Sequence, residues 1–202
     1  MAQVQKPEVR ERILDAGRDA FFTLGYDATT MAGIAKVAGV ATANIYRYVP
    51  DKAALFEAVL PDDLIAEHDR LLDVRVGALV EPVDAGDPAD DLLRFWIDHR
   101  REVATLLDHD GTTSRSDYGP GFVARMVAHV EATRPDGLDD DARALVTLVF
   151  DNTRRAIATI LRTTDDADAI RTRIAGFWSY QLPGLDGLIA WIGSDRTPST
   201  EP

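Results

Sequence analysis

The residues best suited to contact another molecule lie near the N-terminus, in the stretch TTMAGIAKVAGVATANIYRYV at positions 29–49. Its second half carries Thr42, Asn44, Tyr46 and Arg47, which share the outward side of a short helix if that segment is helical. Amide and guanidinium groups pair with base edges, and hydroxyl and guanidinium groups donate to phosphates. The chemistry that this pattern favours is recognition of DNA rather than catalysis.

Two short helices with a sharp turn between them would position these side chains. The first is expected from Met31 to about Val37, with Thr29 or Thr30 as its hydroxyl cap. Gly39 stands where the chain must turn, and a positive φ there suits glycine best. The residues that recur at helical spacing and would share one small core are Ile34, Ala38, Val40, Ile45 and Tyr48. The arrangement is that of a helix-turn-helix.

The motif has an alternative interpretation, because two short helices around a glycine also occur as a structural corner in an all-α core. Single residues have alternative roles as well. Asn44 is equally well a solvated helix residue, Arg47 a partner in a surface ion pair, and Tyr48 a core residue by its spacing. The segments on either side of the motif therefore decide how it is interpreted.

Those segments resemble the DNA-binding domain of the TetR family of bacterial repressors, over the run from about Val9 to Leu60. The matching stretches are ILDAGRDAFFTLGYDATTMAGIAKVAGV and ATANIYRYVPDKAALFEAV. They share with the family a Gly-Tyr pair that ends the first helix, a Thr-Thr cap, and a Tyr-x-Tyr exit followed by a lysine that opens the next helix. Three positions depart from the family pattern: Ala41 replaces a usual capping serine, Val49 a usual phenylalanine, and Ala32 a common arginine.

The resemblance implies a transcriptional repressor that binds a palindromic operator in double-stranded DNA and is released from it by a small-molecule effector. A homodimer would double the site that one recognition helix reads. The residues expected at the DNA are Thr29, Thr30, Thr42, Ala43, Asn44, Tyr46, Arg47, Tyr48 and Lys52.

The charge of the chain is unusual for a DNA-binding protein, because 34 acidic residues outnumber 22 basic ones, for a net charge of −12. The excess lies outside the first 56 residues, which hold seven basic and six acidic side chains. An acidic body weakens non-specific adhesion to DNA and so favours discrimination between sequences. The chain has no cysteine, no apolar run long enough to cross a membrane and no signal-peptide core behind Lys6 and Arg10, so we expect a cytoplasmic protein.

Apolar residues at intervals of three and four continue along the chain, which predicts an all-α protein in which a three-helix head precedes a larger helical body, with about nine helices. Helices are expected at roughly 9–24, 51–76, 88–109, 122–133 and 139–163. A last helical region should begin after Asp165 or Asp166, break at Pro183–Gly184 and end near Gly193. The predicted division is a DNA-binding domain at 1–50, a ligand-binding and dimerisation domain at 51–193, and a disordered tail at 194–202.

The body carries no motif that names an enzymatic reaction, so we expect no catalytic residue, no metal and no cofactor. His99 and Arg100 interrupt an apolar stripe, as the few polar groups of an apolar pocket do. A boundary histidine and an extended arginine explain them as well. The candidate ligand residues, for which core packing is the alternative, are Trp96, His99, Arg100, Tyr118, Phe122, Met126, Phe150 and Arg154.

The last helical region holds more large apolar residues than one terminal helix easily buries against its own body. A second copy would cover them, with a central core helix as the alternative. The expected dimer interface includes Phe177, Trp178, Leu188 and Trp191. Besides a repressor, a helical ligand-binding or scaffold protein with a head that does not bind DNA remains open; a small helical enzyme has little support.

Overall fold

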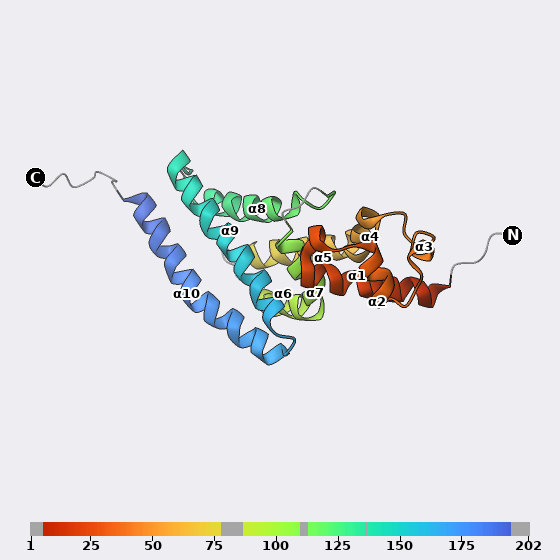
Figure 1. Ribbon diagram of the computed structural model, residues 1–202. Coiled ribbons are helices and arrows are strands. Elements are labelled where there is room, and N and C mark those ends of the chain that lie inside the picture. The colour runs from red at the N-terminus through yellow and green to blue at the C-terminus, as the bar shows by residue number, and fades with distance from the viewer. Residues whose placement is uncertain (1–5, 78–86, 110–112, 136, 195–202) are drawn as a thin grey trace, which may run out of the picture.

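The computed structural model describes residues 6–77, 87–109, 113–135 and 137–194, and within these ranges the chain forms ten helices and no strand. The predicted all-α class is confirmed. A small group of helices, α1 to α4, lies at one end of the molecule, and the two longest helices, α9 and α10, run beside each other at the opposite end (Figure 1).

The head consists of α1 (Pro7–Ala28), α2 (Met31–Val37), α3 (Thr42–Ile45) and α4 (Lys52–Val59). Its core includes Phe21, Ile34, Ile45 and Phe56, each no more than 1% exposed. The rings of Phe21 and Phe56 meet edge to face with their centroids 4.9 Å apart. Apolar faces from all four helices therefore fix the position of α3 on the outside of this small core.

Helix α4 belongs to the same core, because Leu55, Phe56 and Val59 all pack within it. Leu106, from the body helix α7, is also fully buried there. We therefore propose that the boundary between head and body lies after Leu60 rather than at residue 50. The body then contacts the head through the buried side chain of Leu106 as well as through the covalent connection between α4 and α5.

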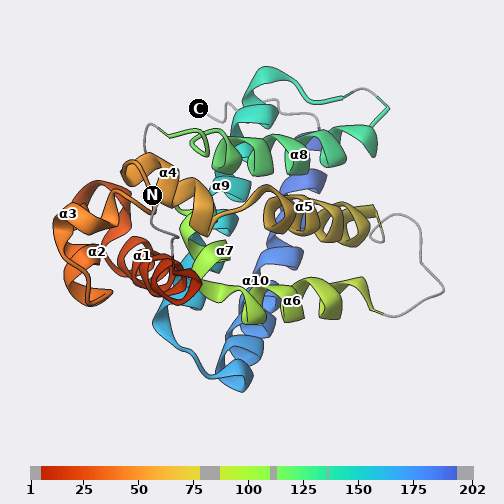
Figure 2. The ribbon, with the colours of Figure 1, turned by 90° about the vertical axis from the view of Figure 1, so that its right-hand side faces the viewer.

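The body consists of α5 (Asp62–Gly77), α6 (Pro88–Asp98), α7 (Arg100–Leu107), α8 (Tyr118–Ala132), α9 (Asp140–Thr163) and α10 (Ala167–Gly193). Figure 2 shows α8, α5 and α6 as neighbouring rods in front of α9 and α10. Their apolar faces form one continuous core, separate from that of the head. Aspartate caps begin α9 and α10, because Asp139 accepts from Ala142 N and Asp166 from Ala169 N.

Three expected helix boundaries are wrong. The helix predicted over 51–76 is two helices, α4 and α5, because Pro61 lacks an N–H and restricts Leu60, which leaves helical geometry at φ −121° and ψ 67°. The helix predicted over 88–109 breaks at His99, at φ −113° and ψ 32°. The break predicted at Pro183 is absent, since α10 runs through it. Pro183 is exposed, so water can satisfy the carbonyl that the proline leaves without a donor.

Several other sequence predictions fall partly outside the described residues. These are the connections that follow the helices predicted at 51–76 and 88–109, of which residues 78–86 and 110–112 lie outside, and, except for Ser194, the tail at 194–202. The long helix predicted from Asp139 to Thr163 is confirmed, with Asp139 as its cap.

Candidate nucleic-acid interface and effector cavity

The turn between α2 and α3 has the geometry that the sequence predicts. Gly39 has a φ of +67°, in the left-handed region that side chains with a Cβ disfavour. The N–H of Val40 reaches back to the carbonyl of Ala35 at 2.9 Å and closes the turn. Ala35 is fully buried, so α3 approaches α2 closely. The two helices and the tight turn together form a helix-turn-helix.

The second helix of this motif presents a polar face to solvent. Ile45 is fully buried beneath α3, whereas Thr42, Ala43, Asn44 and Arg47 are exposed and Tyr46 is half exposed. No side chain caps the start of α3, where Ala41 occupies the cap position. The exposed set equals the expected outward face, and it lies on a rigid support, as a recognition surface requires.

Four other residues expected at the DNA have partners inside the head. The Thr30 hydroxyl caps α2 by accepting from Gly33 N at 3.1 Å, while Thr29 is 2% exposed and donates to the carbonyl of Gly25 at 2.6 Å. Tyr48 is half buried and packs on the head core. Lys52 Nζ donates to main-chain carbonyls at the end of α1. These contacts give each residue a structural role, and their part in DNA binding stays a prediction.

The head is joined to the body by ion pairs as well as by Leu106. Arg101 Nη1 lies 2.6 Å from Asp19 Oδ1, and Arg18 Nε lies 3.1 Å from Glu102 Oε1. Both pairs connect α1 with α7. A displacement of α7 within the body therefore carries the head with it.

An apolar cavity of about 90 Å³ lies inside the body between α5, α6, α8, α9 and α10. Four aromatic side chains contribute to its wall: Trp96, Phe122, Phe150 and Trp178. On the same wall Gln181 Nε2 donates to Thr153 Oγ1 at 2.9 Å, and that hydroxyl donates to the carbonyl of Val149 at the same distance. An apolar lining with a few polar groups is typical of sites that bind small organic molecules.

The cavity brings together only half of the predicted ligand residues. Trp96, Phe122, Met126 and Phe150 line it, as do Arg75, His129 and Trp178, which the sequence analysis did not assign to a pocket. Helical spacing shows which residues share a face but not which faces of five helices converge. The one local signal for Arg75 is its place in the last turn of α5, beside the buried Val76.

The other four predicted ligand residues do not line this cavity. The ring of His99 packs on Phe95 with centroids 4.6 Å apart, and Arg100 donates to the carbonyl of Leu161 at 3.2 Å and covers the ring of Phe22. Tyr118 lies behind Trp96 in a polar network. Arg154 is 2% exposed and donates to the carbonyl of Leu107 while pairing with Asp151. Both arginines stabilise free carbonyls at the ends of helices.

The polar network runs from the surface to the cavity wall. Trp96 Nε1 donates to His68 Nε2 at 2.9 Å, His68 Nδ1 contacts the Tyr118 hydroxyl, and that hydroxyl donates to Asp69 Oδ1 at 2.8 Å. Burial lowers the pKa of His68 to about 4, so the imidazole is neutral at neutral pH. Burial, together with the charge of Asp69, raises the pKa of Tyr118. The indole of Trp96 is thus held in one orientation.

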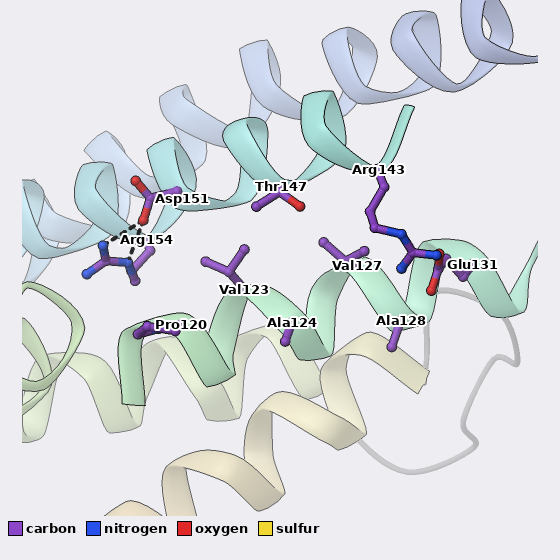
Figure 3. A pocket seen from close by; sticks show the side chains of 10 residues that line it. All are labelled: Pro120, Val123, Ala124, Val127, Ala128, Glu131, Arg143, Thr147, Asp151 and Arg154. Atoms are coloured by element: carbon purple, nitrogen blue, oxygen red, sulfur yellow. Dashed lines mark hydrogen bonds and ion pairs between the residues drawn. The ribbon is translucent and has the colours of Figure 1, made fainter. Parts of the chain in front are cut away.

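A second, more open groove of about 560 Å³ lies between α8 and α9 (Figure 3). Its floor is made of small and aliphatic side chains such as Val123, Ala124 and Val127. Both signs of charge occur around it, with an ion pair between Arg143 and Glu131 at 2.5 Å. The groove is therefore larger than the cavity, but it is also more open and more polar.

The residues predicted at a dimer interface divide into two groups. Trp191 is 52% exposed and lies near the end of α10, on the outer side of the molecule. Trp178 lines the cavity, and Leu188 packs on the body core, so both face inward at least in part. Tyr180, at 75% exposed, adds to the outer face. The apolar surface available to a partner is therefore smaller than the sequence indicated.

Comparison with known proteins identifies the head. Residues 13–59 match the family model described as bacterial regulatory proteins, tetR family. The chain carries a TetR-family DNA-binding domain. A 64-residue segment is 42% identical to the HTH-type transcriptional regulator TtgR of Pseudomonas putida, covering 32% of this chain and 30% of TtgR. The TetR resemblance that the sequence indicated is confirmed for this domain.

The similarity also extends beyond the TetR-family head. The HTH-type transcriptional repressor Rv1474c of Mycobacterium tuberculosis is 27% identical over 194 residues, 94% of this chain and 84% of that protein. The crystal structure of a TetR family transcriptional regulator from Chloroflexus aurantiacus superposes with a TM-score of 0.51 at 20% identity, covering 93% of both chains. The fold of head and body together is that of a TetR-family regulator.

None of the described helices combines the length and the apolar character needed to span a membrane. Within the same residues, no three histidine or acidic side chains gather closely enough to hold a metal ion.

Proposed function

We propose that this protein is a DNA-binding transcriptional regulator, a repressor that binds a palindromic operator as a homodimer and is released by a small-molecule effector. The observation that carries the proposal is the exposed polar face of α3, supported by buried Ile45 in a domain that matches the TetR family. Asn44 and Arg47 supply the donors and acceptors that read base edges, and Thr42 and Tyr46 supply hydroxyls for phosphates.

The effector would act through the helix that leads from the cavity to the head. Trp96 contributes to the cavity wall near the end of α6, and α7 begins at Arg100, immediately after the break at His99. Helix α7 then holds the head through Leu106 and through the pair between Arg101 and Asp19. An effector that binds more tightly to a conformation with α6 displaced increases the population of that conformation. In it, the distance between the two heads of the dimer no longer matches successive major grooves.

The homodimer is proposed from the outer face of α10, where Tyr180 and Trp191 are exposed. One copy presents a single recognition helix of four residues, Thr42–Ile45. Two copies related by a two-fold axis read two half-sites, and this doubling supplies affinity that the short helix lacks.

Selection of genomic fragments by the purified protein, followed by sequencing of the retained DNA, tests this function. We expect enrichment of short inverted repeats, with binding that weakens as salt rises. The variant Arg47→Ala should bind the enriched sequence more weakly, by about 1–3 kcal/mol if Arg47 contacts a base. Arg70→Ala, which removes an exposed arginine of the body that pairs with Glu67, is the matched control and should bind normally. Failure to enrich any sequence would instead support a ligand-binding protein with an inactive head, which the acidic body also fits.

A further inference from the structure

We propose that the effector is a small amphipathic carboxylate, whose apolar body fills the cavity and whose carboxylate is bound by Arg75. This inference rests on the function proposed above and narrows the chemical class of its ligand.

The charged groups at the cavity wall are of one sign. Among the described residues, its lining includes Arg75 and His129 but no acidic residue. The groove between α8 and α9 differs, because Glu131 and Asp151 accompany its arginines. A cationic guest in the cavity would meet an uncompensated like charge, whereas an anionic guest would meet a ready donor.

Arg75 differs from the other half-buried arginines in having no partner of its own. Within the part of the chain that the structure describes, it makes no hydrogen bond and no ion pair, although it is half buried. Arg100 and Arg115, by contrast, donate to main-chain carbonyls at 3.2 and 3.1 Å. A partly desolvated guanidinium without an acceptor gains more from an incoming anion than one that is already paired.

The acidic side chains closest to Arg75 in sequence on α5 are paired with another arginine. Asp69 and Asp73 both lie against Arg125, at 3.1 and 3.3 Å. Arg125 therefore compensates part of their charge, and neither aspartate forms an ion pair with Arg75.

His129 on α8 lines the same cavity as Arg75 on α5. Arg125, one turn before His129, contacts Asp69 and Asp73 on α5, and Tyr118 donates to Asp69, so α5 and α8 run side by side in the same direction (Figure 2). A carboxylate held by the guanidinium can accept a second hydrogen bond from this imidazole, while its apolar body contacts the aromatic wall.

Isothermal titration calorimetry with guests matched in shape and different in charge tests the proposal. The probes are phenylacetate, phenylethanol and phenylethylamine, with hexanoate and hexanol as a second shape. We expect each carboxylate to bind about tenfold or more tightly than its alcohol, since a charged hydrogen bond is worth that factor or more, and the amine to bind most weakly. Phenylacetate should also lower the affinity of the protein for its operator.

Two matched variants assign the preference to one side chain. Arg75→Met keeps the apolar stem, removes the charge and should bring acid and alcohol to equal affinity. Arg70→Met removes an equal charge from the same helix, where the arginine pairs with Glu67 away from the cavity, and should keep the preference. Both variants should have the melting temperature of the wild type, because neither substitution removes a contact of the core.

Three results would overturn the proposal: no binding of either carboxylate, equal affinities for acid and alcohol, or a preference that survives in Arg75→Met. A preference lost in Arg143→Met would likewise move the anion site to the groove between α8 and α9. Selection of DNA by the free protein is measured separately. Normal DNA binding without a carboxylate preference therefore refutes this inference alone, whereas absence of DNA binding refutes the proposed function.

Discussion

Lys52→Met separates a contact with DNA from a role inside the head. Lys52 Nζ donates to the carbonyls of Tyr26 at 2.8 Å and of Thr29 at 3.1 Å, and it lies 4.3 Å from the centre of the Tyr26 ring. Tyr26 lies in the last turn of α1 and Thr29 caps its end, and the Tyr26 carbonyl also accepts from Thr29 N at 3.2 Å. Methionine keeps most of the apolar stem and removes only the ammonium.

The expected loss follows from these contacts. A hydrogen bond to a charged group contributes about 1.5–3 kcal/mol, and a cation over an aromatic ring at an accessible site adds about 0.5–1 kcal/mol. Water can replace part of this, because Lys52 is only half buried. We therefore expect Lys52→Met to lower the free energy of unfolding by about 2 kcal/mol, measured by urea denaturation of the full chain.

The same variant behaves differently in DNA binding according to the role of the lysine. Each phosphate contact contributes about 0.9 to the slope of log affinity against log salt. If Lys52 only stabilises the end of α1, the slope for the operator stays at the wild-type value. Unchanged stability of Lys52→Met together with a slope reduced by about one unit would refute the structural role.

Three further predictions address the turn, the buried histidine and the dimer. Gly39→Val places a β-branched residue at a φ of +67°, which costs more than the roughly 1–2 kcal/mol of an ordinary left-handed residue. DNA binding should therefore be lost, while circular dichroism shows a helical body. Full operator binding by this variant would contradict the turn geometry. Because the pKa of His68 falls from 6.5 to about 4 on folding, the unfolded chain takes up the proton first as pH is lowered. The free energy of unfolding should therefore decline by up to about 3 kcal/mol between pH 6.5 and pH 4. In urea denaturation His68→Gln should lack this pH-dependent loss, and equal pH dependence in both proteins would exclude the histidine as its cause. Trp191→Glu should split a homodimer that uses the exposed indole, and a wild-type protein that sediments as a monomer at micromolar concentration would rule that interface out.

The head could be predicted from the sequence because its signals are local. Gly39 requires a left-handed turn, Thr30 caps the helix that follows it, and the spacing of Ile34 and Ile45 identifies one shared core. The body was predictable only as a set of helices. The break at His99 involves no proline or glycine, so no local signal marked it. At Pro183 the sequence predicted a break that the structure does not have, because an exposed position inside a long helix accommodates a proline.

Two of the misplaced ligand residues, Arg100 and Arg154, have a common physical cause in the ends of helices. Every helix ends with carbonyls that lack an intrahelical donor, and in a body of packed helices many of these ends face other side chains rather than water. A cation near them is stabilised by hydrogen bonds and by the negative end of the helix dipole. Arg100 serves α9 in this way and Arg154 serves α7, whereas Arg75 has no such carbonyl among the described residues. A basic residue on an apolar stripe therefore indicates a ligand only after the helix ends within its reach have been accounted for, and that accounting requires the tertiary structure.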